Sequence, residues 1–183
     1  NVAVGHSALD ANTTGVRNTS VGNESFHDNT TGDYNVAMGH QALYSNTTAD
    51  YNTGIGYAAL TANTTGYGNT ALGRNAGKSI TTGSSCVFVG SDAGREATGN
   101  HSTFVGTGAG YTATGGENTC IGHASGNSLT SASGNTFTGY KSGNSTTTGA
   151  KNVGIGYDAL EKNTTGTRNT AVGYQALEET TEG

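Results

Sequence analysis

The chain has 183 residues, and its composition excludes an ordinary globular core. Gly (31), Thr (32) and Asn (19) far outnumber the 25 Leu, Ile, Val and Phe residues, and Pro and Trp are absent. Charged residues make up 11% and the formal net charge is −5, so the composition does not predict the basic surface that nucleic-acid binding requires. No apolar run approaches the ~18 residues of a membrane span, so membrane insertion is not expected either.

One repeat unit accounts for the whole sequence. It reads Asn-(Thr/Val)-Ala-(Val/Ile)-Gly-x-x-Ala-(Leu/Gly)-x-x-Asn-Thr-Thr-Gly-x-x, and its eleven copies begin at residues 1, 18, 35, 52, 69, 86, 102, 118, 135, 152 and 169. The spacing is 17 residues, shortened to 16 in the copies that begin at 86 and 102. We therefore expect residues 1–183 to be a single repeat array, part of a longer fibre, and we number the positions of each copy from 1 to 17.

The first element of each copy is a short strand that includes the β-prone triplet at positions 2 to 4. Position 4 is aliphatic in ten copies, and position 5 is Gly in all eleven, which indicates a corner with positive φ or a close backbone approach. We expect the strands to centre on position 4, at residues 4, 21, 38, 55, 72, 89, 105, 121, 138, 155 and 172. A second Gly follows the Thr pair in most copies, as at Gly15, Gly32 and Gly66. Two corners in 17 residues predict an all-β fold, a parallel β-solenoid with stacked coils and no α-helix.

Two columns of the repeat predict structural ladders. Position 1 is Asn in nine copies, and stacked Asn side chains can hydrogen-bond along a pile of strands. Position 6 mixes His and Tyr, with His6, His40 and His123 in the same column as four Tyr residues, which favours a stacked surface row.

Alternation along the strand divides its side chains between two faces. We assign positions 2 and 4 to the coil interior and position 3 to the opposite face. Position 3 is small or apolar, and its large residues fall in copies where position 9 is Gly, as close packing between facing sites requires. A second buried row predicts contact with another chain, and hence a parallel homotrimer. Its expected interface comprises Ala3, Ala37, Ala71, Phe88, Phe104, Cys120, Phe137 and Ala171.

The segment Asn-Thr-Ala-Val-Gly-Tyr-Gln-Ala-Leu at 169–177, and its ten counterparts, resembles the head repeats of YadA-type trimeric autotransporter adhesins. Similar arrays are also found in phage tail fibres. The resemblance implies a left-handed parallel β-roll with three chains around one axis. It also implies that Thr170 and Val172 point into the coil and Ala171 points toward the axis. The repeat here is longer than that of the adhesin family.

The sequence contains no pattern typical of a catalytic or metal site. No His-x-His or Cys-x-x-Cys occurs, so no metal ligand or cofactor is assigned and the chain is not expected to be an enzyme. Cys86 and Cys120 fall about two turns apart, ~10 Å along the stack, beyond the reach of a disulfide.

These features favour a non-catalytic segment of an extracellular fibre, on a bacterial surface or a virion. Its variable columns would hold a cell-surface glycan or protein, with Tyr34, Tyr51, Tyr67, Arg74, Arg95 and Tyr111 as the candidate ligand surface. Two alternatives stay open. One is a passive spacer without a ligand, and the other is an ice-binding β-solenoid that uses the Thr pairs, of which alternation would expose one rank.

Overall fold

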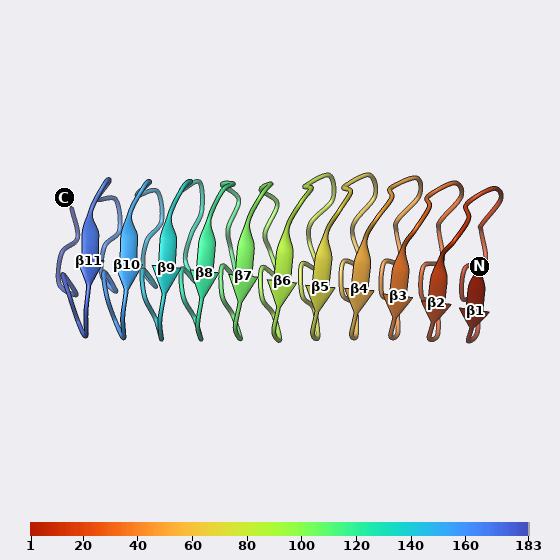
Figure 1. The fold of residues 1–183 in the computed structure, drawn as a ribbon, viewed down its shortest axis with the longest axis horizontal. Coiled ribbons are helices and arrows are strands. Elements are labelled where there is room, and N and C mark those ends of the chain that lie inside the picture. Colours follow the sequence, from red (N-terminus) through yellow and green to blue (C-terminus); the bar gives the residue numbers. More distant parts are fainter. Residues whose placement is uncertain (183) are drawn as a thin grey trace.

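The computed structural model describes residues 1–182 as a single stack of coils, each contributing one short strand (Figure 1). The eleven strands form one parallel sheet in chain order. They are β1 (Val2–Val4), β2 (Thr19–Val21), β3 (Val36–Met38), β4 (Thr53–Ile55), β5 (Thr70–Leu72), β6 (Val87–Val89), β7 (Thr103–Val105), β8 (Thr119–Ile121), β9 (Thr136–Thr138), β10 (Val153–Ile155) and β11 (Thr170–Val172). We number the coils 1 to 11 by their strands.

The predicted parallel solenoid is confirmed, with a one-residue shift in the strands. Each strand covers positions 2 to 4, so the residue before the Gly ends the strand and does not centre it. Register is strict, since position 3 of each strand pairs with position 3 of the next, as in Phe88 with Phe104. Residues 1–182 form no helix, and accordingly none that is long and apolar enough to cross a membrane.

Backbone hydrogen bonds join each coil to its neighbours around its whole circumference. The amide of Val2 donates to the carbonyl of Asn18 over 2.8 Å, and the amide of Gly22 donates back to Val4 over 2.8 Å. Away from the strands the same pattern continues, for example from Leu9 to Ser25 at 3.1 Å. Stacking therefore satisfies backbone groups that a three-residue strand would otherwise leave unpaired.

The corner at position 5 accepts only glycine. Gly106 has φ +131°, and a Cβ built there would lie 2.4 Å from the carbonyl oxygen of Gly122 in the next coil. The same close approach recurs along the column from Gly5 to Gly156. Because neighbouring coils meet here backbone to backbone, any side chain would push them apart, which explains why this Gly recurs in every copy.

The predicted Asn ladder at position 1 is confirmed and is buried. The hydrogen bonds around Asn52 show how the ladder is built. The side-chain oxygen of Asn35 accepts from the Asn52 amide at 2.8 Å, and the oxygen of Asn52 accepts from the Asn69 amide at 2.9 Å. The Asn52 Nδ2 donates to the Gly66 carbonyl at 2.9 Å, across the coil. Each Asn thus joins two coils and also closes its own. In coil 6 the thiol of Cys86 occupies this place and donates to the Gly99 carbonyl.

The interior is filled by position 3, which corrects the sequence-based assignment of the two strand faces. Phe88, Phe104 and Phe137 are fully buried within a single chain, as are Ala37, Ala71 and Cys120, and Ala171 is 3% exposed. Only Ala3, in the first coil, is exposed. The expected trimer interface at these eight residues is therefore wrong, since seven of them have no surface to offer a partner. The inward positions that the resemblance implied for Thr170 and Val172 are wrong too, because both side chains are exposed.

The proposed volume compensation between positions 3 and 9 is confirmed, but inside the coil. A Cβ on Gly77 or Gly94 would lie 2.5 Å or 2.3 Å from the ring of Phe88, and one on Gly110 would lie 2.6 Å from the ring of Phe104. Where position 3 is small, position 9 carries a buried Phe26, Leu43, Leu60 or Leu160. Large and small residues thus alternate across one narrow core, as close packing requires.

The outer face of the sheet carries positions 2 and 4. Its aliphatic side chains at position 4 are exposed or half-buried along the stack, with Leu72 49% and Ile155 41% exposed, and Thr or Val at position 2 stands beside them. We call this surface the strand face. It comprises positions 2 and 4 of β1 to β11.

Candidate functional site

The six residues predicted to form a ligand surface divide into two groups on different columns. Tyr34, Tyr51 and Tyr67 occupy positions 16 and 17, just before the strand, and all three rings are exposed. The rings of Tyr34 and Tyr51 stack at 5.1 Å between centroids, and the guanidinium of Arg17 lies 5.0 Å from the Tyr34 centroid. This group is a short cationic–aromatic row at one margin of the strand face.

Arg74, Arg95 and Tyr111 lie after the strand, at positions 6 and 10, and they surround Asp92. Arg74 forms an ion pair with Asp92, and Arg95 lies 3.8 Å from it while also donating to the Tyr111 hydroxyl at 2.9 Å. Asn75 and Ser91 donate two further hydrogen bonds to the same carboxylate. Burial alone would raise the pKa of Asp92, but these hydrogen bonds and the two guanidinium charges outweigh it and lower the pKa. Arg74, Arg95 and Tyr111 therefore form a network of ion pairs and hydrogen bonds around Asp92.

The predicted His/Tyr row at position 6 is confirmed and extends beyond single pairs. His40 stacks on Tyr57, and His123, Tyr140, Tyr157 and Tyr174 form one continuous stack over four coils, with centroid separations of 4.9 to 5.4 Å. Since each ring covers the faces of its neighbours, the row offers edges and phenol hydroxyls. It does not offer the open ring face on which a sugar would stack, except at the ends of the row.

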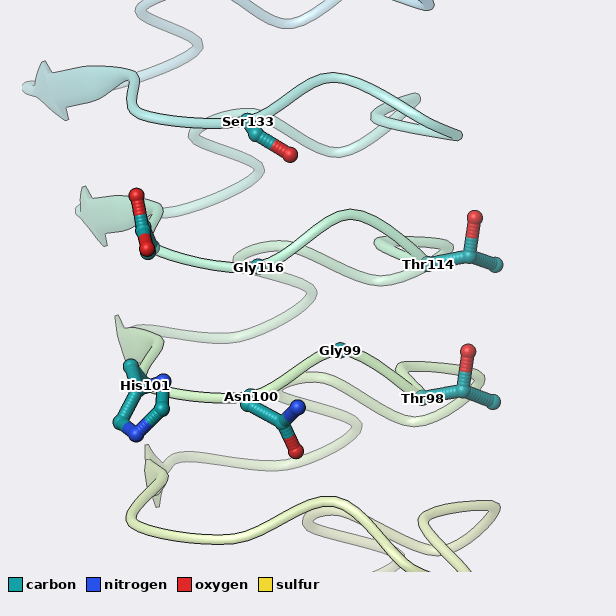
Figure 2. A pocket seen from close by; sticks show the side chains of 8 residues that line it. Thr98, Gly99, Asn100, His101, Thr114, Gly116 and Ser133 are labelled. Carbon is teal, nitrogen blue, oxygen red and sulfur yellow. The ribbon is translucent and has the colours of Figure 1, made fainter.

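A shallow polar hollow of about 380 Å³ lies beside the two shortened copies, in coils 6 to 8 (Figure 2). Its lining residues are Thr98, Gly99, Asn100, His101, Thr114, Gly116, Glu117 and Ser133. Coils 6 and 7 each lack one residue in this corner, so the chain takes a shorter path between position 13 and the next strand. The sequence contained the signal for this hollow in its two 16-residue spacings.

The Thr pairs differ from their expected arrangement. The second residue of a pair is exposed and the first is half-buried in most coils, as in Thr65 and Thr64, and the pair lies in a bend, where strand alternation does not apply. The hydroxyl of the first Thr is engaged, since Thr64 donates to the Thr81 carbonyl at 3.1 Å and its counterparts in other coils do the same. These hydroxyls belong to the coil-to-coil bonding.

The two cysteines are both free and buried, which agrees with the expected absence of a disulfide between them. Burial raises the pKa of each thiol, so both stay protonated at neutral pH. Neither thiol is therefore a candidate nucleophile.

Comparison with known proteins gives no match. No family model fits the chain, and no curated protein and no solved structure is similar to it. Function must therefore be argued from the surfaces themselves.

Proposed function

We propose that the chain is a non-catalytic segment of an extracellular fibre. In this proposal three copies associate in parallel and expose their variable columns for attachment to a cell-surface glycan or protein. One observation carries the proposal, namely the strand face, where position 4 is aliphatic in ten of the eleven strands and each of those side chains is exposed or half-buried. Soluble monomers rarely expose contiguous apolar patches above a few hundred Å², and larger ones mark interaction sites.

The dimensions of the strand face favour other copies of the same chain as its partner. Eleven strands at ~4.8 Å give a length of roughly 50 Å, and three residues give a width of ~10 Å, hence about 500 Å² per chain. The face repeats with the strand spacing, and another copy has an apolar strip of the same length and period. Because the strip is one strand wide, three can meet around one axis. The row at positions 16 and 17 and the row at position 6 would then flank the contact.

The oligomeric state tests this proposal. We expect sedimentation equilibrium to give a trimer, and the double variant Leu72→Lys, Ile121→Lys to give a folded monomer. Both side chains are exposed in the single chain, so the substitutions leave the coil interior intact. The lysine charges would lie in the contact between chains, where they would repel one another and lose their solvation on association.

The matched control is the double variant Thr65→Lys, Thr148→Lys, which adds the same charges on exposed corners away from the strand face. It should remain trimeric. A wild-type chain that sediments as a folded monomer would contradict self-association, and a stable dimer would contradict the three-chain arrangement.

The strand face also favours a second candidate, ice binding. Position 2 is Thr in seven of the eleven strands and position 4 is aliphatic in ten, so hydroxyls and methyl groups stand in parallel rows at the strand spacing. Thermal hysteresis of the purified chain separates the two functions. Ice binding needs the face free in solution, so hysteresis that is abolished by Leu72→Lys, Ile121→Lys in a monomeric chain would favour it over the fibre.

A further inference from the structure

Coil 10 carries an acidic group at the same corner where coil 6 holds the Asp92 network. Asp158 and Glu161 come from coil 10 and Glu178 from coil 11, and their carboxylate oxygens lie within 4.8 Å of one another. Coils 10 and 11 stand at the blue end of the stack, where β10 and β11 are labelled (Figure 1). Sequence reasoning missed it because the residues of one column are 17 apart in the chain. The signal available was the coincidence of acidic residues at positions 7 and 10 of adjacent copies.

Comparison of the two corners shows what coil 10 lacks. Asp92 and Asp158 share position 7, but Arg95 is replaced by Glu161 at position 10, and Tyr111 of the following coil is replaced by Glu178. The chain neutralises Asp92 with two guanidinium groups. At coil 10 Lys141 lies 3.5 Å from Glu161, and Lys162 forms an ion pair with Glu179. With Glu179 and Lys162 included, four carboxylates and two ammonium groups leave an excess of two negative charges.

A second observation points to a missing ligand. Asp158 is 8% exposed, and its Oδ1 is buried without a hydrogen-bond partner among the described residues. An unpaired buried carboxylate oxygen is costly unless a cation or donor reaches it. A cation bound at this corner would pair with that oxygen.

We propose that Asp158, Glu161 and Glu178 bind a calcium ion between coils 10 and 11. All donors are carboxylate oxygens, the ligands that hard divalent cations prefer. Calcium–oxygen bonds of ~2.4 Å allow two ligand oxygens to lie up to ~4.8 Å apart, and the three groups fall within that limit. Water completes the coordination shell on the exposed side. The ion would tie coil 11 to coil 10 through side chains, in addition to the backbone bond from Lys162 to Glu178.

Terbium luminescence tests the site directly, because Tb³⁺ replaces Ca²⁺ and is sensitised by nearby tyrosines. Tyr157 precedes Asp158 in the chain and stacks between Tyr140 and Tyr174. We expect saturable tyrosine-sensitised emission from the full chain, displaced by added Ca²⁺. Asp158→Asn should weaken Tb³⁺ binding by about tenfold or more, since one of three charged ligands is lost.

The matched control is Asp92→Asn, at the same position in a corner that the chain neutralises by itself, and it should leave Tb³⁺ affinity unchanged. Glu178→Gln provides a second test on the half-buried side of the site, with circular dichroism to verify that each variant is folded. A wild-type chain without saturable emission would overturn the proposal. Equal Tb³⁺ affinity in the wild type, Asp158→Asn and Glu178→Gln would overturn it as well.

Discussion

At the scale of single residues, polar side chains hold the stack together where apolar ones are scarce. The Asn side chain at position 1 satisfies two backbone groups at once, an amide of the next coil and a carbonyl across its own coil, as described for Asn52. A buried amide in this role cannot be replaced by a smaller apolar group without leaving those partners unpaired.

Substitution of Asn52 measures this contribution. We expect Asn52→Ala to lower the free energy of unfolding by about 2–4 kcal/mol, because one buried backbone donor, the Asn69 amide, and one acceptor, the Gly66 carbonyl, lose their partners. The measurement is chemical denaturation followed by circular dichroism. Asn23→Ala is the matched control, since Asn23 is exposed, and it should change stability by no more than about 0.5 kcal/mol. Similar losses for the two variants would contradict a structural role for the ladder.

The two carboxyl groups at position 7, Asp158 and Asp92, have pKa values shifted in opposite directions, so their contributions to stability should change with pH in opposite directions. The pKa of Asp158 is raised, by burial and by Glu161, while Glu178 and Lys141 also face the carboxyl. Its ionisation therefore destabilises the fold as pH rises through the folded pKa. With calcium chelated, we expect Asp158→Asn to raise the melting temperature near about pH 7, with the gain vanishing toward about pH 4.

Asp92 should behave in the reverse manner. Its pKa is lowered, so its contribution is present above the ordinary carboxyl pKa and is lost as pH falls through the folded value. Asp92→Asn should accordingly lower the melting temperature at neutral pH, and the penalty should shrink in acid. Thermal melts over a pH series compare the two variants, and shifts of the same sign for both would refute the electrostatic account of this corner.

At the scale of the coil, the sequence predicted the elements well but not the direction of their side chains. Recurrent Gly and β-prone triplets were sufficient to place eleven strands to within one residue. Alternation tells only that positions 2 and 4 share one face and position 3 the other, and not which face is inside. A decisive signal was present, because an Asn ladder at position 1 is buried and position 1 lies on the same face as position 3.

The facing pair at positions 3 and 9 offers a test of the core. Phe88→Ala should cost about 3–5 kcal/mol through the cavity it leaves, and Gly77→Leu alone should clash with the Phe88 ring. Leu is compatible with this corner, since Leu60 has φ +53° at the same position. We expect the double variant to recover at least about 1 kcal/mol relative to the sum of the single changes, measured by a double-mutant cycle. Strict additivity would show that the two sites do not face each other.

At the scale of the whole molecule, every coil repeats the same thin core, and the strand face remains on the outside of the stack. Each coil contacts only its neighbours, so stability is a sum of nearest-neighbour terms along the stack. The corner of coil 10 was not predictable from single positions, because its three carboxylates come together only through stacking. The same holds for the hollow of coils 6 to 8, whose depth depends on how a shortened corner refolds.

The coil-to-coil hydrogen bonds run along the axis of the stack, which determines how the chain would respond to mechanical load. A pull along that axis puts the same tension on every junction, because the junctions lie in series, and the weakest junction opens first. Each coil that opens releases 16 or 17 residues, about 55–60 Å of extended chain, in place of the ~4.8 Å it occupied when folded. A segment with this geometry would extend in many small steps, absorbing work and sparing whatever it connects from a sudden force.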